Sequence, residues 1–129
     1  MARAPLFRYD NRMSESSFLA VGDHVGLLLG SIRCEKVGAR EAQILEHELD
    51  TLAPSRGWRI ILDMAEVQMV ASMGLGLLVS VHKKAKSGGG ALVICNLRPE
   101  LLELVQLTHL HKFLKLVPDR NAALKAVLL

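Results

Sequence analysis

The sequence predicts an α/β fold in which a single layer of mixed, mostly parallel β-sheet packs against helices. Two near-continuous apolar runs, at residues 58–64 and 91–95, have the composition of parallel strands that are buried on both faces. The segments between and around them carry apolar residues at helical spacing. Near the N-terminus, two β-type runs joined by a short turn indicate an antiparallel pair. Together these observations give the element order β-β-α-β-α-β-α-β-α, with right-handed crossovers between the parallel strands.

The N-terminal part begins with an arm and a hairpin. Residues 1–17 show no periodicity, so we expect a flexible arm or a loosely docked strand there, followed by one domain over residues 18–129. The two β-type runs are at residues 18–21 and 25–32. We expect the hairpin turn at Gly22–His24, because Gly and Asp favour short turns.

The rest of the chain alternates helices with strands. Pro54 follows the first helix and the glycines at residues 88–90 follow the second, while Pro99 and Pro118 lie where the third and fourth begin. A short last strand is expected at residues 113–117. The residues predicted to form the inward faces of the four helices are Ala42, Leu45, Leu49 and Leu52; Leu75, Leu78, Val79 and His82; Leu101, Leu102, Leu104 and Val105; and Leu124, Val127 and Leu128.

Composition excludes several classes of function. The chain of 129 residues has 16 Lys and Arg against 13 Asp and Glu, and the resulting formal charge of +3 is too small to indicate a nucleic-acid partner. No apolar segment approaches the ~18 residues of a membrane span, so we expect no membrane insertion. No secretory signal is visible, and we therefore expect a cytoplasmic protein. The cluster Lys83, Lys84 and Lys86 is explained by its place at a helix end, where cations oppose the dipole.

The sequence contains no recognisable catalytic or metal motif. The patterns GxxxxGK[ST], HExxH and GxSxG are all absent from it. Cys34 and Cys95 match neither a redox pair nor a zinc spacing, so we expect free, buried thiols. His109 and His111 have no neighbouring ligand in sequence, and we expect Asp63, at a strand end, to cap or fix a turn. These patterns predict a protein that is not an enzyme and has no cofactor or metal site.

Ser72 is the residue of this sequence that we identify as a candidate site of chemical modification. It supplies the single hydroxyl of the apolar stretch Val67–Leu78, where the second helix begins. We expect Ser72 at the helix N-cap, where unpaired N–H groups and the positive end of the dipole would stabilise a phosphate on the hydroxyl. A plain helix cap is the alternative. Gly74 and Gly76 are expected to let the helix start pack closely on the sheet.

Three segments together carry a family resemblance. An apolar strand ends in Asp63, and a short loop leads to Ala-Ser-Met-Gly-Leu-Gly at residues 71–76. A Lys-Ser-Gly-Gly-Gly helix end follows at 86–90, and Leu-Thr-His-Leu-His-Lys-Phe at 107–113. From residue 18 to the C-terminus the chain thus resembles the STAS domain, the module of anti-sigma factor antagonists and of the cytoplasmic tails of sulphate transporters.

The resemblance implies a function for Ser72. In the antagonist branch of the family, the serine at this position is phosphorylated by a partner anti-sigma factor that is also an ATP-dependent kinase. The chain would then bind an anti-sigma factor or related serine kinase and be switched by phosphorylation of Ser72; a homodimer is also compatible with the sequence. The residues implied in partner binding are Arg33, Ala71, Ser72, Met73, Gly74 and Leu75.

The chain departs from the family pattern around this serine. Ala71 replaces an Asp, Met73 replaces a second hydroxyl residue, and Arg33 replaces another Asp. Without the adjacent carboxylate, phosphoryl transfer becomes slower or absent if that group orients the hydroxyl. Conversely, the loss of this carboxylate removes its repulsion of a phosphate on Ser72, and Arg33 could pair with that phosphate. The alternative function is a non-phosphorylated STAS subunit of a transporter ATPase complex or a sensory scaffold. His109 also replaces a Gly suited to left-handed backbone.

Overall fold

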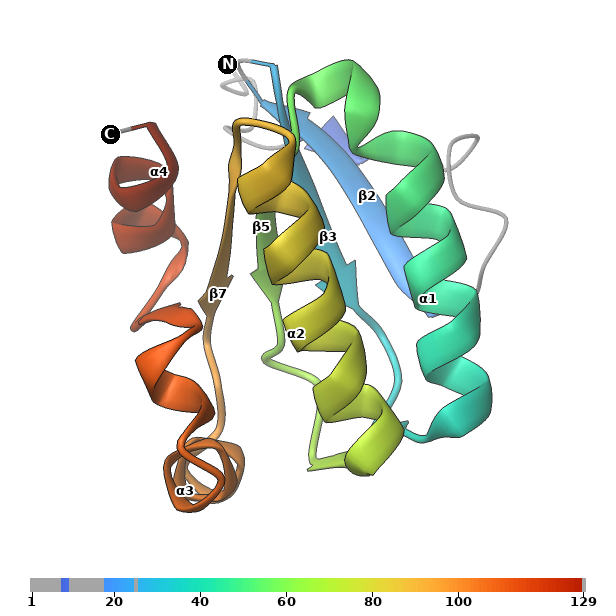
Figure 1. Ribbon diagram of the computed structural model, residues 1–129, viewed down its shortest axis with the longest axis vertical. Helices are drawn as coiled ribbons and strands as arrows, with labels where there is room; N and C mark the ends of the chain where they lie inside the picture. The colour runs from blue at the N-terminus through green and yellow to red at the C-terminus, as the bar shows by residue number, and fades with distance from the viewer. Residues whose placement is uncertain (1–7, 10–17, 25, 129) are drawn as a thin grey trace, which may run out of the picture.

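A six-stranded mixed sheet forms the centre of the molecule (Figure 1). The computed structural model describes residues 8–9, 18–24 and 26–128. The strand order is β1-β2-β3-β5-β7-β8, antiparallel from β1 to β3 and parallel from β3 to β8, which confirms the predicted α/β class. The strands are β1 (Arg8–Tyr9), β2 (Leu19–His24), β3 (Leu27–Ile32), β5 (Arg59–Asp63), β7 (Ala91–Cys95) and β8 (Lys115–Val117).

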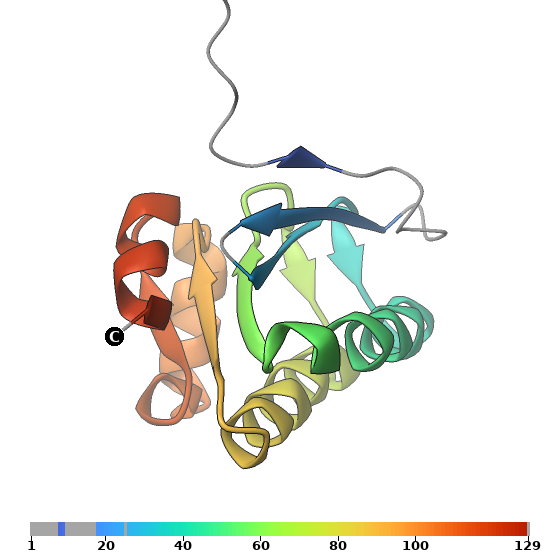
Figure 2. The same ribbon diagram turned by 90° about the horizontal axis from the view of Figure 1, so that it is seen from above.

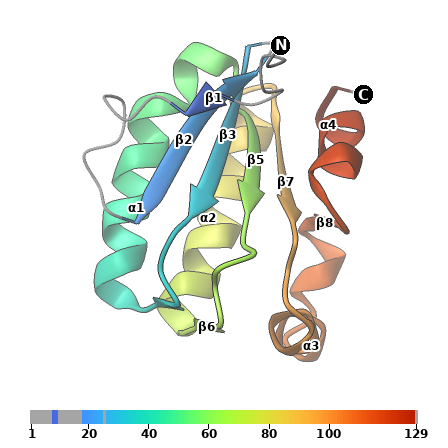
Figure 3. The same ribbon diagram turned by 180° about the vertical axis from the view of Figure 1, so that it is seen from behind.

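Helices cover both faces of the sheet. Helices α1 (Ala39–Leu52) and α2 (Ser72–Ser87) lie side by side on one face (Figures 1 and 2). Helix α4 (Arg120–Leu128) packs on the other face against β5 and β7, and α3 (Pro99–Leu107) lies at one end (Figure 3). Within the described part of the chain, no helix combines the length and the apolar character needed to cross a membrane.

The side chains of the central strands alternate between two core layers, because successive residues of a strand point to opposite faces. One layer lies under α1 and α2, and the other lies under α4. Burial on both sides explains why these strands are almost continuously apolar in sequence. The first layer includes Leu28, Ile60, Leu62 and Leu92, and the second includes Leu29, Ile61, Val93 and Ala123.

The hairpin between β2 and β3 is confirmed, but the predicted position of its turn is wrong. Leu19 pairs with Ile32 and His24 with Leu27, so Gly22–His24 belongs to the strand. The connection consists of residues 25 and 26, of which the structure describes Gly26, at φ +75°. The turn lies there because Gly26 adopts left-handed backbone angles without steric cost.

The inward face of α2 is rotated relative to the prediction. Its buried residues are Gly74, Leu77, Leu78, Val81 and Ala85, whereas Leu75, Val79 and His82 are half-buried. Two of the buried residues, Gly74 and Ala85, are small. A pattern based on large apolar side chains therefore misses the face of α2 that packs against the rest of the protein. The face of α1 follows the prediction, with Ala42, Leu45 and Leu49 buried and Leu52 half-buried.

The ends of the chain agree with the predictions in part. Arg8–Tyr9 forms the short strand β1 beside β2, and the rest of residues 1–17 lies outside the described residues (Figure 2). The division into an arm and a domain over residues 18–129 stays a prediction. The last strand is shorter than expected, because residues 110–112 form a 3-10 turn and Phe113 is exposed.

Candidate functional site

Ser72 is the first residue of α2 and not its N-cap. Ala71 takes the N-cap position, and its carbonyl accepts a hydrogen bond from the N–H of Leu75 at 3.0 Å. The Ala71 N–H donates to the carbonyl of Val37 at 2.9 Å, and the backbone of Ala71 is extended, so the helix begins one residue earlier than predicted. Ser72 is exposed, and within the described residues its hydroxyl has no hydrogen-bond partner. It still lies in the first helical turn, where N–H groups lack intrahelical acceptors.

A two-stranded parallel sheet, separate from the main one, supports the start of α2. Its strands β4 (Lys36–Val37) and β6 (Met69–Val70) join the loops that follow β3 and β5. The carbonyl of Glu35 accepts hydrogen bonds from the N–H groups of Gln68 and Met69 at 2.8 and 2.9 Å. Sequence reasoning missed this sheet, since two-residue strands are too short to show periodicity.

Gly74 brings α2 into contact with this small sheet. A Cβ atom at Gly74 would lie 2.8 Å from the carbonyl oxygen of Val37 and 2.5 Å from a methyl carbon of Val70. The close-packing prediction is therefore confirmed for Gly74. It is wrong for Gly76, where a Cβ would meet nothing within 4 Å.

The surface beside Ser72 is apolar and accessible. Met69 and Met73 are 57% and 54% exposed. Methionine is common at protein-binding surfaces because its flexible, polarisable side chain adapts to different partners. Met69 was not among the residues predicted for partner binding. Of those six, Arg33, Ser72 and Met73 are exposed, Ala71 and Leu75 are half-buried, and Gly74 is buried.

Arg33 lies just after β3, on one of the two loops that the small sheet joins. Its N–H donates to the carbonyl of Phe18 at 2.7 Å. Across the described ranges, its guanidinium has neither a hydrogen-bond nor an ion-pair partner, and no contact to Ser72 is formed. A cation free of partners remains available to an incoming group.

Asp63 fixes the loop that leads from β5 to Ser72. It is 4% exposed; Oδ1 accepts a hydrogen bond from the N–H of Ala65 at 3.0 Å, as the predicted turn role requires. Its Oδ2 accepts a hydrogen bond from Nε of Arg120 at 2.6 Å. The partner in α4 is distant in sequence, and no local pattern indicated it.

The cysteines and histidines show no sign of a metal site. Cys95 is buried and Cys34 is half-buried, and both thiols are free. Burial, reinforced by the nearby Asp63 carboxylate, raises the pKa of Cys95 to about 12. His109, which replaces a Gly of the family pattern, has left-handed backbone angles at φ 62°, and its ring centroid is 6.3 Å from that of His111. Among residues 8–9, 18–24 and 26–128, no three His, Cys, Asp or Glu side chains gather around a point that could hold a metal.

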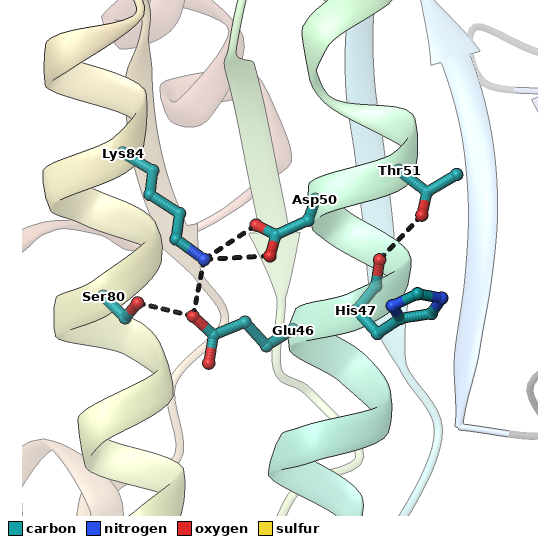
Figure 4. Close-up of polar contacts among 6 residues, drawn as sticks. All are labelled: Glu46, His47, Asp50, Thr51, Ser80 and Lys84. Atoms are coloured by element: carbon teal, nitrogen blue, oxygen red, sulfur yellow. Dashed lines mark hydrogen bonds and ion pairs between the residues drawn. The ribbon is translucent and has the colours of Figure 1, made fainter.

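A polar bridge holds α2 against α1 (Figure 4). Nζ of Lys84 donates to Glu46 Oε2 at 2.8 Å and to both carboxylate oxygens of Asp50 at 2.9 Å. Ser80 Oγ donates to the same Glu46 oxygen at 2.5 Å. These hydrogen bonds lower the pKa of Glu46 and raise that of Lys84. Lys84 thus has interhelical partners that the helix-end interpretation did not include.

Comparison with known proteins places the chain in a family. Residues 35–123 match the sequence profile of the STAS domain, and the chain belongs to the STAS domain family. It is 28% identical over 90 residues to BtrV of Bordetella bronchiseptica, a protein named as an anti-sigma factor antagonist; the match covers 70% of this chain and 78% of BtrV. The chain is therefore an anti-sigma factor antagonist-like STAS protein, a non-enzymatic type.

Two solved structures show the same fold. One is the crystal structure of tm1081 from Thermotoga maritima, also named as an anti-sigma factor antagonist, with a TM-score of 0.76, 17% identity, and coverage of 88% of this chain and 97% of that one. The other is the Bacillus cell fate determinant SpoIIAA in its phosphorylated form, with a TM-score of 0.59, 13% identity, and coverage of 93% and 98%.

Proposed function

We propose that this protein binds an anti-sigma factor or a related serine kinase through the surface at the start of α2, and that phosphorylation of Ser72 ends the binding. The observation that carries the proposal is the exposed hydroxyl of Ser72 at the first residue of α2, beside the exposed side chains of Met69 and Met73. A kinase can reach this oxygen, and the same surface offers apolar contacts to a partner.

One physical effect would make a phosphate at this position act as a switch. It would add about 1.5 to 2 negative charges. In the free protein, the N–H groups and positive dipole end of the first helical turn stabilise that charge. In a complex, the apolar partner surface around Met73 would have to desolvate it without compensation, which is unfavourable. Phosphorylation therefore favours the free protein over the complex.

Ala71 stands where the family pattern has an Asp, so the kinase would have to supply the base that this carboxylate could provide. With no carboxylate beside Ser72, the proton of the hydroxyl has to be accepted by a base of the kinase itself. The absence of that carboxylate also spares the product a like-charge repulsion, and Arg33 is free to approach the phosphate. The first effect concerns the rate of phosphoryl transfer, and the second concerns the stability of the phosphorylated product.

The relatives support the same proposal. BtrV is named as an anti-sigma factor antagonist, and SpoIIAA, which shares the fold, has been solved in a phosphorylated form. If the present chain acts in the same way, a serine at the start of α2 would be the site of its modification.

Incubation with the cognate anti-sigma factor kinase and Mg·ATP tests the phosphoacceptor. Intact mass spectrometry should show one phosphate, and peptide mapping should place it on Ser72. Ser72→Ala should remain unmodified, while Ser80→Ala, in the same helix, should be modified like the natural protein. Modification that persists in Ser72→Ala, or an unmodified protein after prolonged incubation with the active kinase, would contradict the proposal.

A second candidate function is favoured by Ala71 and by the apolar character of the surface. The chain would then be a permanent STAS subunit of a transporter ATPase complex or a sensory scaffold, bound through Met69 and Met73. Such a complex should form equally well with Ser72→Asp, which distinguishes it from the switch.

A further inference from the structure

A basic groove lies on α2 well away from Ser72. It has a volume of about 370 Å³ and is formed by the C-terminal half of α2, the start of β7, and the segment that leads into β8. At a helical rise of ~1.5 Å per residue, His82 and Lys86 lie about 15 and 21 Å along α2 from Ser72. Figure 3 shows β8 beside β7 at the edge of the sheet, where this groove is found. A partner held at Ser72 would thus leave the groove open.

The charges along the groove have a single sign. His82, Lys86, Lys112 and Lys115 line it, and no acidic side chain does so among the described residues. The three lysines are exposed, and within the described part of the chain their ammonium groups have no ion-pair or hydrogen-bond partner. This differs from Lys84, two residues before Lys86 in α2, which is held by Glu46 and Asp50. The uncompensated cations favour an anionic ligand.

Phe113 adds an apolar feature to the same groove. It lines the groove and is 64% exposed, although a ring of this size is usually buried. Aromatic side chains are enriched at protein-binding surfaces. A small inorganic anion would make no use of this ring.

We propose that this groove is a second docking site, which binds an acidic segment of a partner protein with an apolar side chain placed against Phe113. Carboxylates of the segment pair with Lys86, Lys112 and Lys115. A single-stranded nucleic acid fits less well, since such ligands need several stacking platforms and a longer basic track. The protein would then hold two partners, one at each end of α2.

Titration with a synthetic peptide tests the proposal. The probe is a blocked peptide in which Asp and Glu alternate with Leu and Phe, and its control carries Asn and Gln in place of the acids. In ¹H–¹⁵N spectra, the acidic peptide should shift resonances of residues 82–92 and 112–115 and leave residues 69–75 unchanged. The neutral peptide should bind at least about fivefold more weakly, and added salt should weaken the acidic peptide.

Charge-matched variants locate the site. Lys86→Glu combined with Lys115→Glu should weaken the acidic peptide about tenfold, because two attractions become repulsions. Arg40→Glu combined with Lys125→Glu, exposed and outside the groove, should change affinity less than about twofold. Phe113→Ala should also weaken binding, and Phe113→Leu should restore part of it; circular dichroism verifies that each variant is folded.

Four results would overturn the proposal. They are an absence of shifts in the groove, shifts at residues 69–75 instead, equal affinity for the acidic and neutral peptides, and binding of ATP, inorganic phosphate or a single-stranded oligonucleotide without binding of the acidic peptide. None of these results depends on whether Ser72 is phosphorylated, so this test fails or succeeds separately from the proposed switch.

Discussion

Asp63 connects the loop that leads to Ser72 with the opposite face of the sheet. Its Oδ1 accepts a hydrogen bond from the N–H of Ala65, at the start of the loop. Its Oδ2 accepts a hydrogen bond from Arg120, at the start of α4. The carboxylate is almost fully buried, so neither contact can be replaced by water at low cost. One residue therefore fixes both the path of the loop and the position of the last helix.

Asp63→Asn should lower the free energy of unfolding by about 1–3 kcal/mol, because an amide NH2 replaces the buried carboxylate oxygen that accepts the hydrogen bond from Arg120. The amide oxygen can still accept the hydrogen bond from Ala65, so the protein should stay folded. Urea unfolding measures the change, with Glu66→Gln, at an exposed carboxylate in the same loop, as the control that should stay within about 0.5 kcal/mol. A loss in Asp63→Asn no larger than in the control would contradict this role.

Single residues show where sequence reasoning works and where it ends. The turn made by Asp63 follows from the local pattern and is present. The bond from Asp63 to Arg120 depends on how distant segments are brought together, which no local spacing encodes. The N-cap was predicted one residue too late, because Ala71 is the extended residue whose carbonyl accepts the helical hydrogen bond from the N–H of Leu75.

At the scale of elements, the start of α2 is held in place by β4 and β6. Contact between the helix and this small sheet requires a residue without a side chain at Gly74, where a Cβ would meet the carbonyl oxygen of Val37. The position of the Ser72 surface is thus set by backbone contacts, which are stiffer than contacts between long side chains.

Two neighbouring glycines of α2 give a matched comparison. Gly74→Ala should lower the free energy of unfolding by about 1–3 kcal/mol through overpacking. Gly76→Ala should raise it by about 0.5–1 kcal/mol, because its Cβ enters open space and alanine favours the helix. Urea unfolding of both variants tests the pair; changes of the same sign would show that α2 does not press on the small sheet as described.

Long elements were predictable, and short or composite ones were not. The strands β5 and β7 and the helix α1 carry strong apolar patterns over many residues, so their type and order follow from the sequence. The strands β4 and β6 are two residues long and leave no pattern. The groove lined by Lys86, Lys112 and Phe113 combines segments that are distant in sequence, and of its lysines only Lys86 was interpreted from the sequence, as a cation at a helix end.

At the scale of the whole molecule, stability depends on pH through the bridge between α1 and α2. The pKa of Glu46 is lowered from its ordinary value of 4.5 by hydrogen bonds from Lys84 and then Ser80. A lowered pKa means that the carboxylate stabilises the fold above about pH 4.5 and ceases to do so as the pH falls through the folded-state value. The pKa of Lys84 is raised, so Lys84 stabilises the fold fully below pH 10.5, its ordinary pKa. This stabilisation is lost only at higher pH.

Glu46→Gln should therefore be less stable than the natural protein at about pH 7, and the difference should shrink as the pH falls through the lowered pKa of Glu46. The difference at neutral pH should be about 0.3–1 kcal/mol, since the side chain of Glu46 is 31% exposed and water screens the pair. Urea unfolding over this pH range measures it, with Glu103→Gln, on exposed α3 surface, as the control. A stability difference that stays constant down to the lowest pH would contradict the role of the bridge.

The two proposed surfaces give the molecule a simple layout, with a switchable site at the start of α2 and a basic groove beside its end. Because α2 is fixed to α1 by the Lys84 bridge and to β6 by Gly74, both surfaces belong to one rigid unit. Phosphorylation at Ser72 should accordingly control the first site and leave the second unaffected.

Calorimetric titration of the cognate anti-sigma factor with the protein, before and after phosphorylation, measures whether a phosphate on Ser72 ends the binding. The unphosphorylated protein and Ser72→Ala should bind with similar affinity, since a lone hydroxyl contributes little to an apolar contact. The form phosphorylated at Ser72 should bind at least about tenfold more weakly, which corresponds to a loss of ~1.4 kcal/mol in binding free energy. Equal or tighter binding by the phosphorylated form would contradict the claim that the start of α2 is a contact surface closed by a phosphate.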